Sequence, residues 1–247
     1  MILSFSVGNT NVRFARVDAQ GTLEPGGTLA VRDSSVPEVL LAQASGAEAV
    51  IAASVRPDNF DPLAAALAAR GMAVQVAGRD FAIPIDNRYE HPGDVGVDRL
   101  LAVVGAMQLF PGEGVVVVDF GTALTVNVGS PRGEFLGGLI CLGLSSAAVA
   151  LAAAAPRLPH VALEPPAGFV ARETGRAIND GLLWQAVGAV ERVLRGLRDE
   201  VPFALRVVLT GGDAARVAPL LERHDGVAPD LVLRGVWASF AAARGLR

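Results

Sequence analysis

The feature that most constrains the fold of this 247-residue chain is a strand–turn–strand segment over residues 115–128. Its four consecutive valines are typical of a buried strand, which ends in a carboxylate at Asp119. Gly121 then permits close backbone approach, and the hydroxyls of Thr122 and Thr125 can donate to phosphate oxygens. Because the chain turns directly into a second strand, the segment predicts a phosphate-binding hairpin rather than a P-loop. Asp119 is a hard oxygen ligand suited to Mg²⁺ or a monovalent cation.

A hairpin of the same kind, with its turn at residues 8–11, opens the chain, so each half of the sequence begins with one. The other elements repeat the same order, which predicts an α/β fold made by duplication, with a ligand cleft between the halves. The break at residues 111–114 places the halves at 1–112 and 113–247. Expected elements are strands at 27–32, 47–55, 73–77, 134–140 and 206–210, and helices at 36–45, 61–71, 100–109, 144–154, 175–197 and 235–243. The segment 230–233 precedes the last helix.

Composition excludes several kinds of chemistry. All 21 basic residues are arginine, which removes the P-loop lysine, the protein-kinase lysine and Schiff-base catalysis. A net charge of −4 gives no general attraction to nucleic acid. The single cysteine, Cys141, excludes a disulfide framework and a cysteine zinc site, and it is expected to be a small core residue. A nucleotide enzyme built from this chain would therefore have to hold phosphates with backbone N–H groups, hydroxyls, metal and arginine.

The stretch 137–155 carries no charged residue over 19 positions, long enough to consider a membrane span. It is rich in Gly, Ala and Ser and has no aromatic belt, which favours a buried strand followed by a helix. The N-terminus resembles a first strand rather than a targeting signal. The expectation is a soluble, cytoplasmic protein that binds no membrane.

The motifs, taken together and in order, resemble the type III pantothenate kinases of the acetate kinase/sugar kinase/heat-shock chaperone/actin superfamily. The resemblance spans essentially the whole chain and is carried by segments 7–11, 96–99, 119–123, 137–138, 143–144, 158–159, 173–174, 210–212 and 230–233. It implies duplicated ribonuclease H-like (actin-like ATPase) domains with mixed five-stranded sheets. It also implies a homodimer that transfers phosphate from ATP to pantothenate, the first step of coenzyme A synthesis, using Mg²⁺ and K⁺ or NH₄⁺.

By position, the resemblance assigns roles to individual residues. Asp98 matches the catalytic base, and Asp119 matches the ligand of the monovalent cation. The pantothenate contacts match Tyr89, Gly96, Val97, Asp98, Arg99 and Thr174. The ATP contacts match Ser6, Val7, Gly8, Asn9, Thr10, Asn11, Val12, Arg13, Thr122, Gly211 and Gly212.

The chemistry of Asp98 and Arg99 is consistent with these roles. A hydroxyl that attacks a phosphate needs a carboxylate within hydrogen-bonding reach, and a guanidinium can hold the pantothenate carboxylate through two hydrogen bonds. The alternative is an acid at a helix N-terminus beside a surface arginine. The surrounding motifs favour the catalytic interpretation.

The sequence departs from the family pattern at four positions. Ser6 stands where the family has an aspartate that helps to place the metal and the transferred phosphate. Asn127 replaces an aspartate, Leu142 a proline and Ala155 a threonine. Because phosphoryl transfer depends on electrostatic positioning, three hypotheses follow: an active pantothenate kinase, an impaired homologue with a binding or transcription-accessory role, or a kinase of another small hydroxyl substrate. Retention of Tyr89, Asp98 and Arg99 favours pantothenate over another acceptor.

Overall fold

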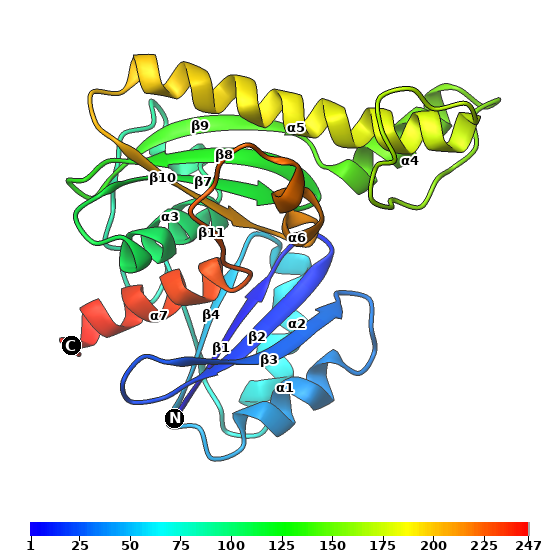
Figure 1. Cartoon of the computed structure of the whole chain (residues 1–247). Helices are drawn as coiled ribbons and strands as arrows, with labels where there is room; N and C mark the ends of the chain where they lie inside the picture. Colours follow the sequence, from blue (N-terminus) through cyan, green and yellow to red (C-terminus); the bar gives the residue numbers. More distant parts are fainter. Residues whose placement is uncertain (247) are drawn as a thin grey trace. The chain divides into compact units, whose positions relative to one another are not determined.

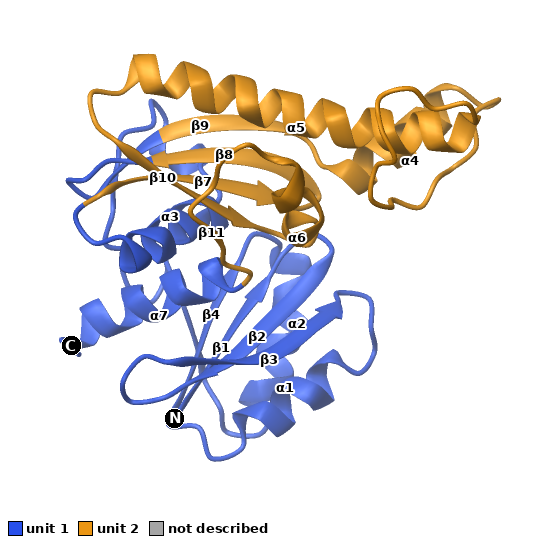
Figure 2. Ribbon diagram, viewed as in Figure 1, with its two compact units in different colours: residues 1–112, 129–136, 230–247 blue, residues 113–128, 137–229 orange. Residues whose placement is uncertain are grey.

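The computed structural model describes residues 1–246, which form two compact units (Figure 2). Unit 1 contains residues 1–112 and 129–136 together with the C-terminal segment from residue 230. Unit 2 contains residues 113–128 and 137–229. These units group segments by packing, whereas the predicted division at residue 112 marks the start of a repeat. The repeat boundary therefore stays a prediction, and the chain returns to unit 1 twice after it.

The sheet of unit 1 has the strand order β3-β2-β1-β4-β5 (Figure 1). Its first three strands, β1 (Ile2–Val7), β2 (Asn11–Val17) and β3 (Leu23–Ala30), are antiparallel neighbours, which confirms the predicted N-terminal hairpin. Strand β4 (Ala49–Ser54) is parallel to β1, and β5 (Val74–Val76) is parallel to β4. The sheet is mixed and five-stranded, as predicted.

Alternating side chains bury both faces of this sheet. Leu3, Phe5 and Val7 pack with α1 (Val36–Ala44) and α2 (Pro57–Ala68). Ile2 of β1 and Ile51 of β4 point the other way, into a core with α3 (Val97–Leu109) and α7 (Leu231–Arg244). A short strand β6 (Asp86–Asn87) and a 3-10 turn η1 (Pro92–Asp94) lead into α3.

Helices α3 and α7 approach closely at two glycines. A side chain at Gly105 would overlap the Leu231 carbonyl, and one at Gly235 would overlap the Leu101 carbonyl. Only glycine permits the two backbones to come this close. The close contact with α3 holds α7 in unit 1, although α7 lies more than 100 residues after the first part of that unit.

The second sheet has six strands in the order β11-β10-β7-β8-β9-β6, one more than predicted. The predicted phosphate hairpin is formed by β7 (Gly114–Phe120) and β8 (Ala123–Gly129), followed by β9 (Glu134–Leu142), whose first residues belong to unit 1 and pair with β6. Strand β10 (Leu205–Thr210) is parallel to β7 and to β11 (Gly226–Val227). The remaining elements are α4 (Leu144–Ala154), α5 (Thr174–Glu200), α6 (Ala214–Val217) and the 3-10 turn η2 (Ala218–Leu220).

Three local predictions differ from the structure. The helix predicted at 61–71 is α2, which begins earlier, at Pro57, so that Pro62 lies inside it. Pro57 can begin the helix because the first helical position needs no backbone N–H. The segment 137–155 does form a strand and a helix, but it is only partly buried. Leu144 and Ala148 belong to the core, whereas Leu142 is 64% exposed and Val149 is 56% exposed. Cys141, predicted in the core, is exposed on the same strand end. None of the helices in residues 1–246 combines the length and apolar character that a membrane crossing requires.

Candidate active site

The predicted acceptor residues gather at the first turn of α3 in unit 1. Gly96 is the N-cap, and Asp98 and Arg99 follow inside the helix. Arg99 is only 8% exposed, and its guanidinium carbon lies 5.8 Å from the ring centre of Tyr89 and 5.5 Å from that of Phe135. Cation–π contacts with two aromatic rings stabilise the guanidinium and restrict its movement. The structure thus brings Tyr89, Asp98 and Arg99 together and adds Phe135, which sequence patterns did not reveal.

The Asp98 carboxylate is held close to the backbone of its own helical turn. Its Oδ1 atom accepts a hydrogen bond of 2.9 Å from the Arg99 N–H. The same oxygen occupies the space that a side chain at Gly96 would need, so the glycine is required for this carboxylate position. Burial raises the pKa of Asp98, and the Arg99 N–H and guanidinium oppose that rise only in part. A carboxylate with a raised pKa is a better proton acceptor than an ordinary aspartate.

Strand β9 contributes Phe135 to this cluster, and the preceding residue, Glu134, has a buried carboxylate. Its oxygens accept hydrogen bonds of 2.6 Å from the Ser130 hydroxyl, 2.9 Å from Arg88 and 3.2 Å from Arg132. These donors lower the pKa of Glu134 to about 2. Since Glu134 precedes Phe135 and Arg88 precedes Tyr89, the network fixes both aromatic residues that surround Arg99.

We expect Glu134→Gln to destabilise the protein at neutral pH and to have less effect in acid. The folded pKa of about 2 lies below the ordinary value of 4.5, so the carboxylate stabilises the fold above pH 4.5. That contribution is lost as pH falls from 4.5 towards 2. Melting temperatures of both proteins across this range measure the effect, with the exposed Glu24→Gln as control. A constant difference at all pH values would contradict it.

The N-terminal hairpin of unit 1 carries the predicted ATP residues Ser6 to Arg13. Its turn is closed by a 2.9 Å hydrogen bond from the Gly8 N–H to the Asn11 carbonyl. Ser6 pairs directly with Arg13 across β1 and β2, so the two side chains share one face of the sheet. The side chains of Val7 and Val12 face the other way and are buried in the core.

The second group of predicted phosphate and cation residues lies in unit 2. The Asp119 carboxylate at the end of β7 lies against both Gly121 and Gly211. Gly211, at a φ of +96°, begins the turn after β10, and the Asp213 N–H fastens that turn to the Phe120 carbonyl at 3.1 Å. The Thr122 carbonyl accepts the Gly143 N–H at 3.1 Å and the Ser146 hydroxyl at 2.7 Å. Asp119, Thr122, Gly211 and Gly212 therefore belong to one rigid set of turns.

The remaining predicted contact, Thr174, is the first residue of α5 in unit 2, so it belongs to a different unit from the other acceptor residues. The preceding Glu173 caps this helix by accepting the N–H groups of Gly175 and Arg176 at 2.7 and 2.8 Å. Among the four departures from the family pattern, Asn127 is buried and its amide donates to the Thr125 hydroxyl at 2.9 Å.

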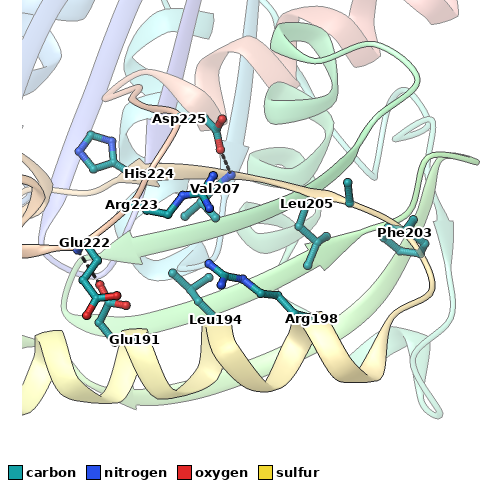
Figure 3. Close-up of a pocket in the computed structure, with 11 residues that line it drawn as sticks. Glu191, Leu194, Arg198, Phe203, Leu205, Val207, Glu222, Arg223, His224 and Asp225 are labelled. Carbon is teal, nitrogen blue, oxygen red and sulfur yellow. Dashed lines mark hydrogen bonds between the residues drawn. The ribbon is translucent and has the colours of Figure 1, made fainter.

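Unit 2 also contains a pocket of about 380 Å³ between α5 and the start of β10 (Figure 3). It is lined by Leu194 and Arg198 of the helix, by Leu205 and Val207 of the strand, and by residues 222–225. Asp119, Gly211 and the other predicted ligand-binding residues do not line it. It lies near the opposite end of β10 from Gly211, so it is separate from the predicted nucleotide residues.

Comparisons with known proteins agree with the motif pattern. The family model described as type III pantothenate kinase matches residues 2–196. A type III pantothenate kinase of Oleidesulfovibrio alaskensis is 36% identical over 252 residues, covering 96% of this chain and 95% of that protein. One from Caulobacter vibrioides is 32% identical, with 96% and 95% covered.

Solved structures with low sequence identity share the fold. Component A of (R)-2-hydroxyglutaryl-CoA dehydratase from Acidaminococcus fermentans has a TM-score of 0.54 at 13% identity, covering 99% of this chain and 97% of that one. A ROK family protein from Streptococcus pneumoniae has a TM-score of 0.50 at 10% identity, with 99% of each chain covered. The fold is the predicted α/β architecture, with two mixed sheets covered by helices. With the motifs in place and relatives similar over nearly the full length, the chain belongs to the type III pantothenate kinase family, whose members are kinases that phosphorylate an alcohol group.

Proposed function

We propose that this protein phosphorylates the primary hydroxyl of pantothenate with ATP. The observation that supports it best is the Asp98 carboxylate, whose pKa is raised by burial and which lies beside a guanidinium enclosed by aromatic rings. A general base must accept the hydroxyl proton as the oxygen attacks phosphorus, and its efficiency increases when its pKa approaches the working pH.

The neighbouring residues fit the rest of the acceptor. Pantothenate carries one carboxylate, and the Arg99 guanidinium offers two parallel donors to such a group. Tyr89 combines an apolar ring with a hydroxyl, which suits a partly polar substrate. In this proposal Arg99 orients the acceptor, Tyr89 and residues Gly96 and Val97 line it, and Asp98 removes the proton. Thr174 is a further contact.

The donor side is proposed from the two hairpins. Backbone N–H groups and hydroxyls from residue 6 to residue 13, with Thr122, Gly211 and Gly212, are the phosphate and nucleotide contacts. Asp119 fits a ligand of K⁺ or NH₄⁺, because its carboxylate is constrained by the glycine turns around it. Mg²⁺ on a nucleotide takes most of its ligands from phosphate and water, so it needs few protein carboxylates.

A second candidate function rests on Ser6. Its hydroxyl carries no charge where the family pattern has a carboxylate, and this favours an impaired homologue with a binding or transcription-accessory role over an efficient kinase. The intact acceptor cluster favours retention of pantothenate binding in either case.

The test is phosphorylation of pantothenate by the purified protein at high ATP, with Mg²⁺ and K⁺ or NH₄⁺. Melting curves with pantothenate alone and with ATP and Mg²⁺ give an independent binding readout, because a ligand that binds only the folded state raises the melting temperature. Turnover supports the kinase. Stabilisation by pantothenate without turnover supports the impaired homologue, and no response to either ligand contradicts both.

A homodimer is also part of the proposal. Large apolar side chains at the end of β9 and on α4 are exposed in the single chain: Leu139, Ile140, Leu142 and Val149. Exposed apolar side chains of this kind are typical of association surfaces.

We expect Ile140→Asp to shift the protein from dimer to monomer in size-exclusion chromatography with light scattering, with the exposed Arg192→Asp as control. A wild-type monomer would contradict the proposal. A cytoplasmic location without nucleic-acid binding completes the proposal, and the net charge of −4, which gives no general attraction to nucleic acid, supports it.

A further inference from the structure

Beside the N-terminal hairpin, unit 1 contains a pocket of about 400 Å³, and most of the residues that line it are polar. The polar residues are Asn9 and Thr10 of the hairpin turn, Arg32 after β3, and Arg56 and Asn59 around the start of α2. Of these, Arg32, Arg56 and Asn59 belong to none of the motifs that identify the family.

The topology explains why distant segments meet there. Strands β1 and β4 run in parallel and end at Val7 and Ser54, which are paired residues. Strand β3 ends at Ala30 opposite Asn11, the first residue of β2. The hairpin turn and the chain after β3 and β4 therefore share one edge of the sheet, the edge at which open α/β sheets bind ligands.

Backbone hydrogen bonds hold the walls of this pocket in place. The Val31 N–H donates to the Thr10 carbonyl at 2.8 Å, joining the segment after β3 to the hairpin turn. The Arg56 N–H donates to the Ser54 hydroxyl at 3.1 Å, and the Asn59 N–H donates to the Arg56 carbonyl at 3.1 Å. These hydrogen bonds hold the backbone segments around the pocket in fixed positions.

The charge in the pocket is positive. Two guanidinium groups line it and no carboxylate does. Within residues 1–246 the Arg32 guanidinium has no ion pair or hydrogen bond, because the neighbouring Asp33 carboxylate instead accepts the hydroxyl and N–H of Ser35 at 2.7 and 2.9 Å. Arg56 meets Asp58 only at 3.9 Å, and both side chains are largely exposed. Exposed pairs at such a separation are weak, so both guanidinium groups remain available to an anion.

We infer that this pocket is a phosphate subsite in which Arg32 and Arg56 position the phosphate groups of the nucleotide, with the Asn9 and Asn59 amides as further donors. The inference rests on the proposed function, which it deepens. The chain has no lysine, and Ser6 removes one charge that would place the metal. Two arginines beside the hairpin add positive charge to that of Arg13 on the hairpin itself.

Calorimetric titration of the full-length protein with tripolyphosphate, in the absence of pantothenate, tests the subsite directly. Arg32→Met and Arg56→Met keep side-chain length but remove charge, and Arg70→Met removes an exposed arginine of unit 1 that does not line the pocket. We expect each pocket variant to bind tripolyphosphate about tenfold more weakly, with a smaller dependence on salt, and the Arg70 variant to match the wild type. Circular dichroism and melting temperature verify that each variant is folded.

Two further arms separate the sources of phosphate. Tight binding of tripolyphosphate and ATP with weak binding of inorganic phosphate supports nucleotide phosphates as the ligand. Equal binding of inorganic phosphate would instead make free phosphate the ligand and overturn the assignment to the nucleotide. Where turnover is measurable, the pocket variants should raise KM for ATP and leave kcat within about twofold.

The subsite is contradicted if the wild type does not bind tripolyphosphate, or if Arg70→Met weakens binding as much as the pocket variants do. Its failure is distinguishable from failure of the proposed function. Tripolyphosphate binding that depends on Arg32 and Arg56, in a protein that does not phosphorylate pantothenate, would remove the acceptor assignment and leave the subsite standing.

Discussion

Replacing Asp98 by asparagine is expected to reduce kcat for pantothenate phosphorylation by roughly 10²- to 10⁴-fold, the usual contribution of a general base. Asparagine has nearly the same shape, and its carbonyl can still accept the Arg99 N–H that Asp98 accepts at 2.9 Å. The acceptor cluster should therefore keep its geometry and still bind pantothenate. Only proton removal from the hydroxyl is lost, so KM for pantothenate should change little.

The same variant should be more stable than the wild type at neutral pH. Burial raises the folded pKa of Asp98 above its ordinary value of 3.8, so the charged form is disfavoured by folding. A group with a raised pKa stabilises the fold below its unfolded pKa, and this contribution is lost as pH rises through the folded pKa. Asparagine is neutral throughout, and its advantage should shrink as pH falls towards 3.8.

Kinetics and melting temperatures of Asp98→Asn, compared over the acid range, measure both effects. The control is Asp94→Asn, which removes an exposed carboxylate four residues earlier. Loss of activity together with a higher melting temperature would support the view that Asp98 serves catalysis and lowers the stability of the folded protein at neutral pH. Full activity in the variant would show that Asp98 is not the base, whatever its stability.

Part of this acceptor cluster could be predicted from sequence and part could not. Gly96, Asp98 and Arg99 are consecutive or nearly so, and their motif was recognisable. Phe135 and Glu134 lie in a strand whose pairing with β6 depends on a register that local patterns do not specify. Strand β6 has only two residues, too short for any alternation to be detected. The aromatic enclosure of Arg99 is therefore a property of tertiary pairing.

The fold shows the same division between local and long-range information. Both hairpins were predicted because glycine turns and alternating apolar residues are local signals. The helix predicted at 175–197 is confirmed as α5, whose buried face includes Ala186, Val190 and Leu194 at intervals of four. The return of α7 to unit 1 rests on Gly105 and Gly235, which are 130 residues apart. The exposure of residues 139–142 could not be predicted, because an apolar stretch has the same sequence pattern whether it is buried inside its own chain or against another molecule.

Ser6→Asp is the second change with a large expected effect, and we expect it to increase kcat by about 10- to 100-fold at saturating ATP, within the range that single electrostatic contacts contribute. Ser6 is partly exposed at the end of β1 and lies directly opposite Arg13. A carboxylate there would share a face with that arginine, a favourable cross-strand arrangement of opposite charges. It would also place a hard oxygen ligand two residues before the Gly8 turn, where the proposed metal-bound phosphates lie.

The variant Ser6→Asn carries a side chain with nearly the shape of aspartate but no charge, so it separates the effect of charge from that of side-chain size. If the missing carboxylate limits the reaction, Ser6→Asp should be faster and should need less Mg²⁺ for half-maximal rate, whereas Ser6→Asn should resemble the wild type. A silent wild type with an active Ser6→Asp would identify a kinase scaffold disabled at one position. Equal rates in all three proteins would contradict the prediction. In that case the charges of Arg13, Arg32 and Arg56 along the same sheet edge would suffice to position the phosphates, and Ser6 would be a tolerated change rather than the cause of an impaired enzyme.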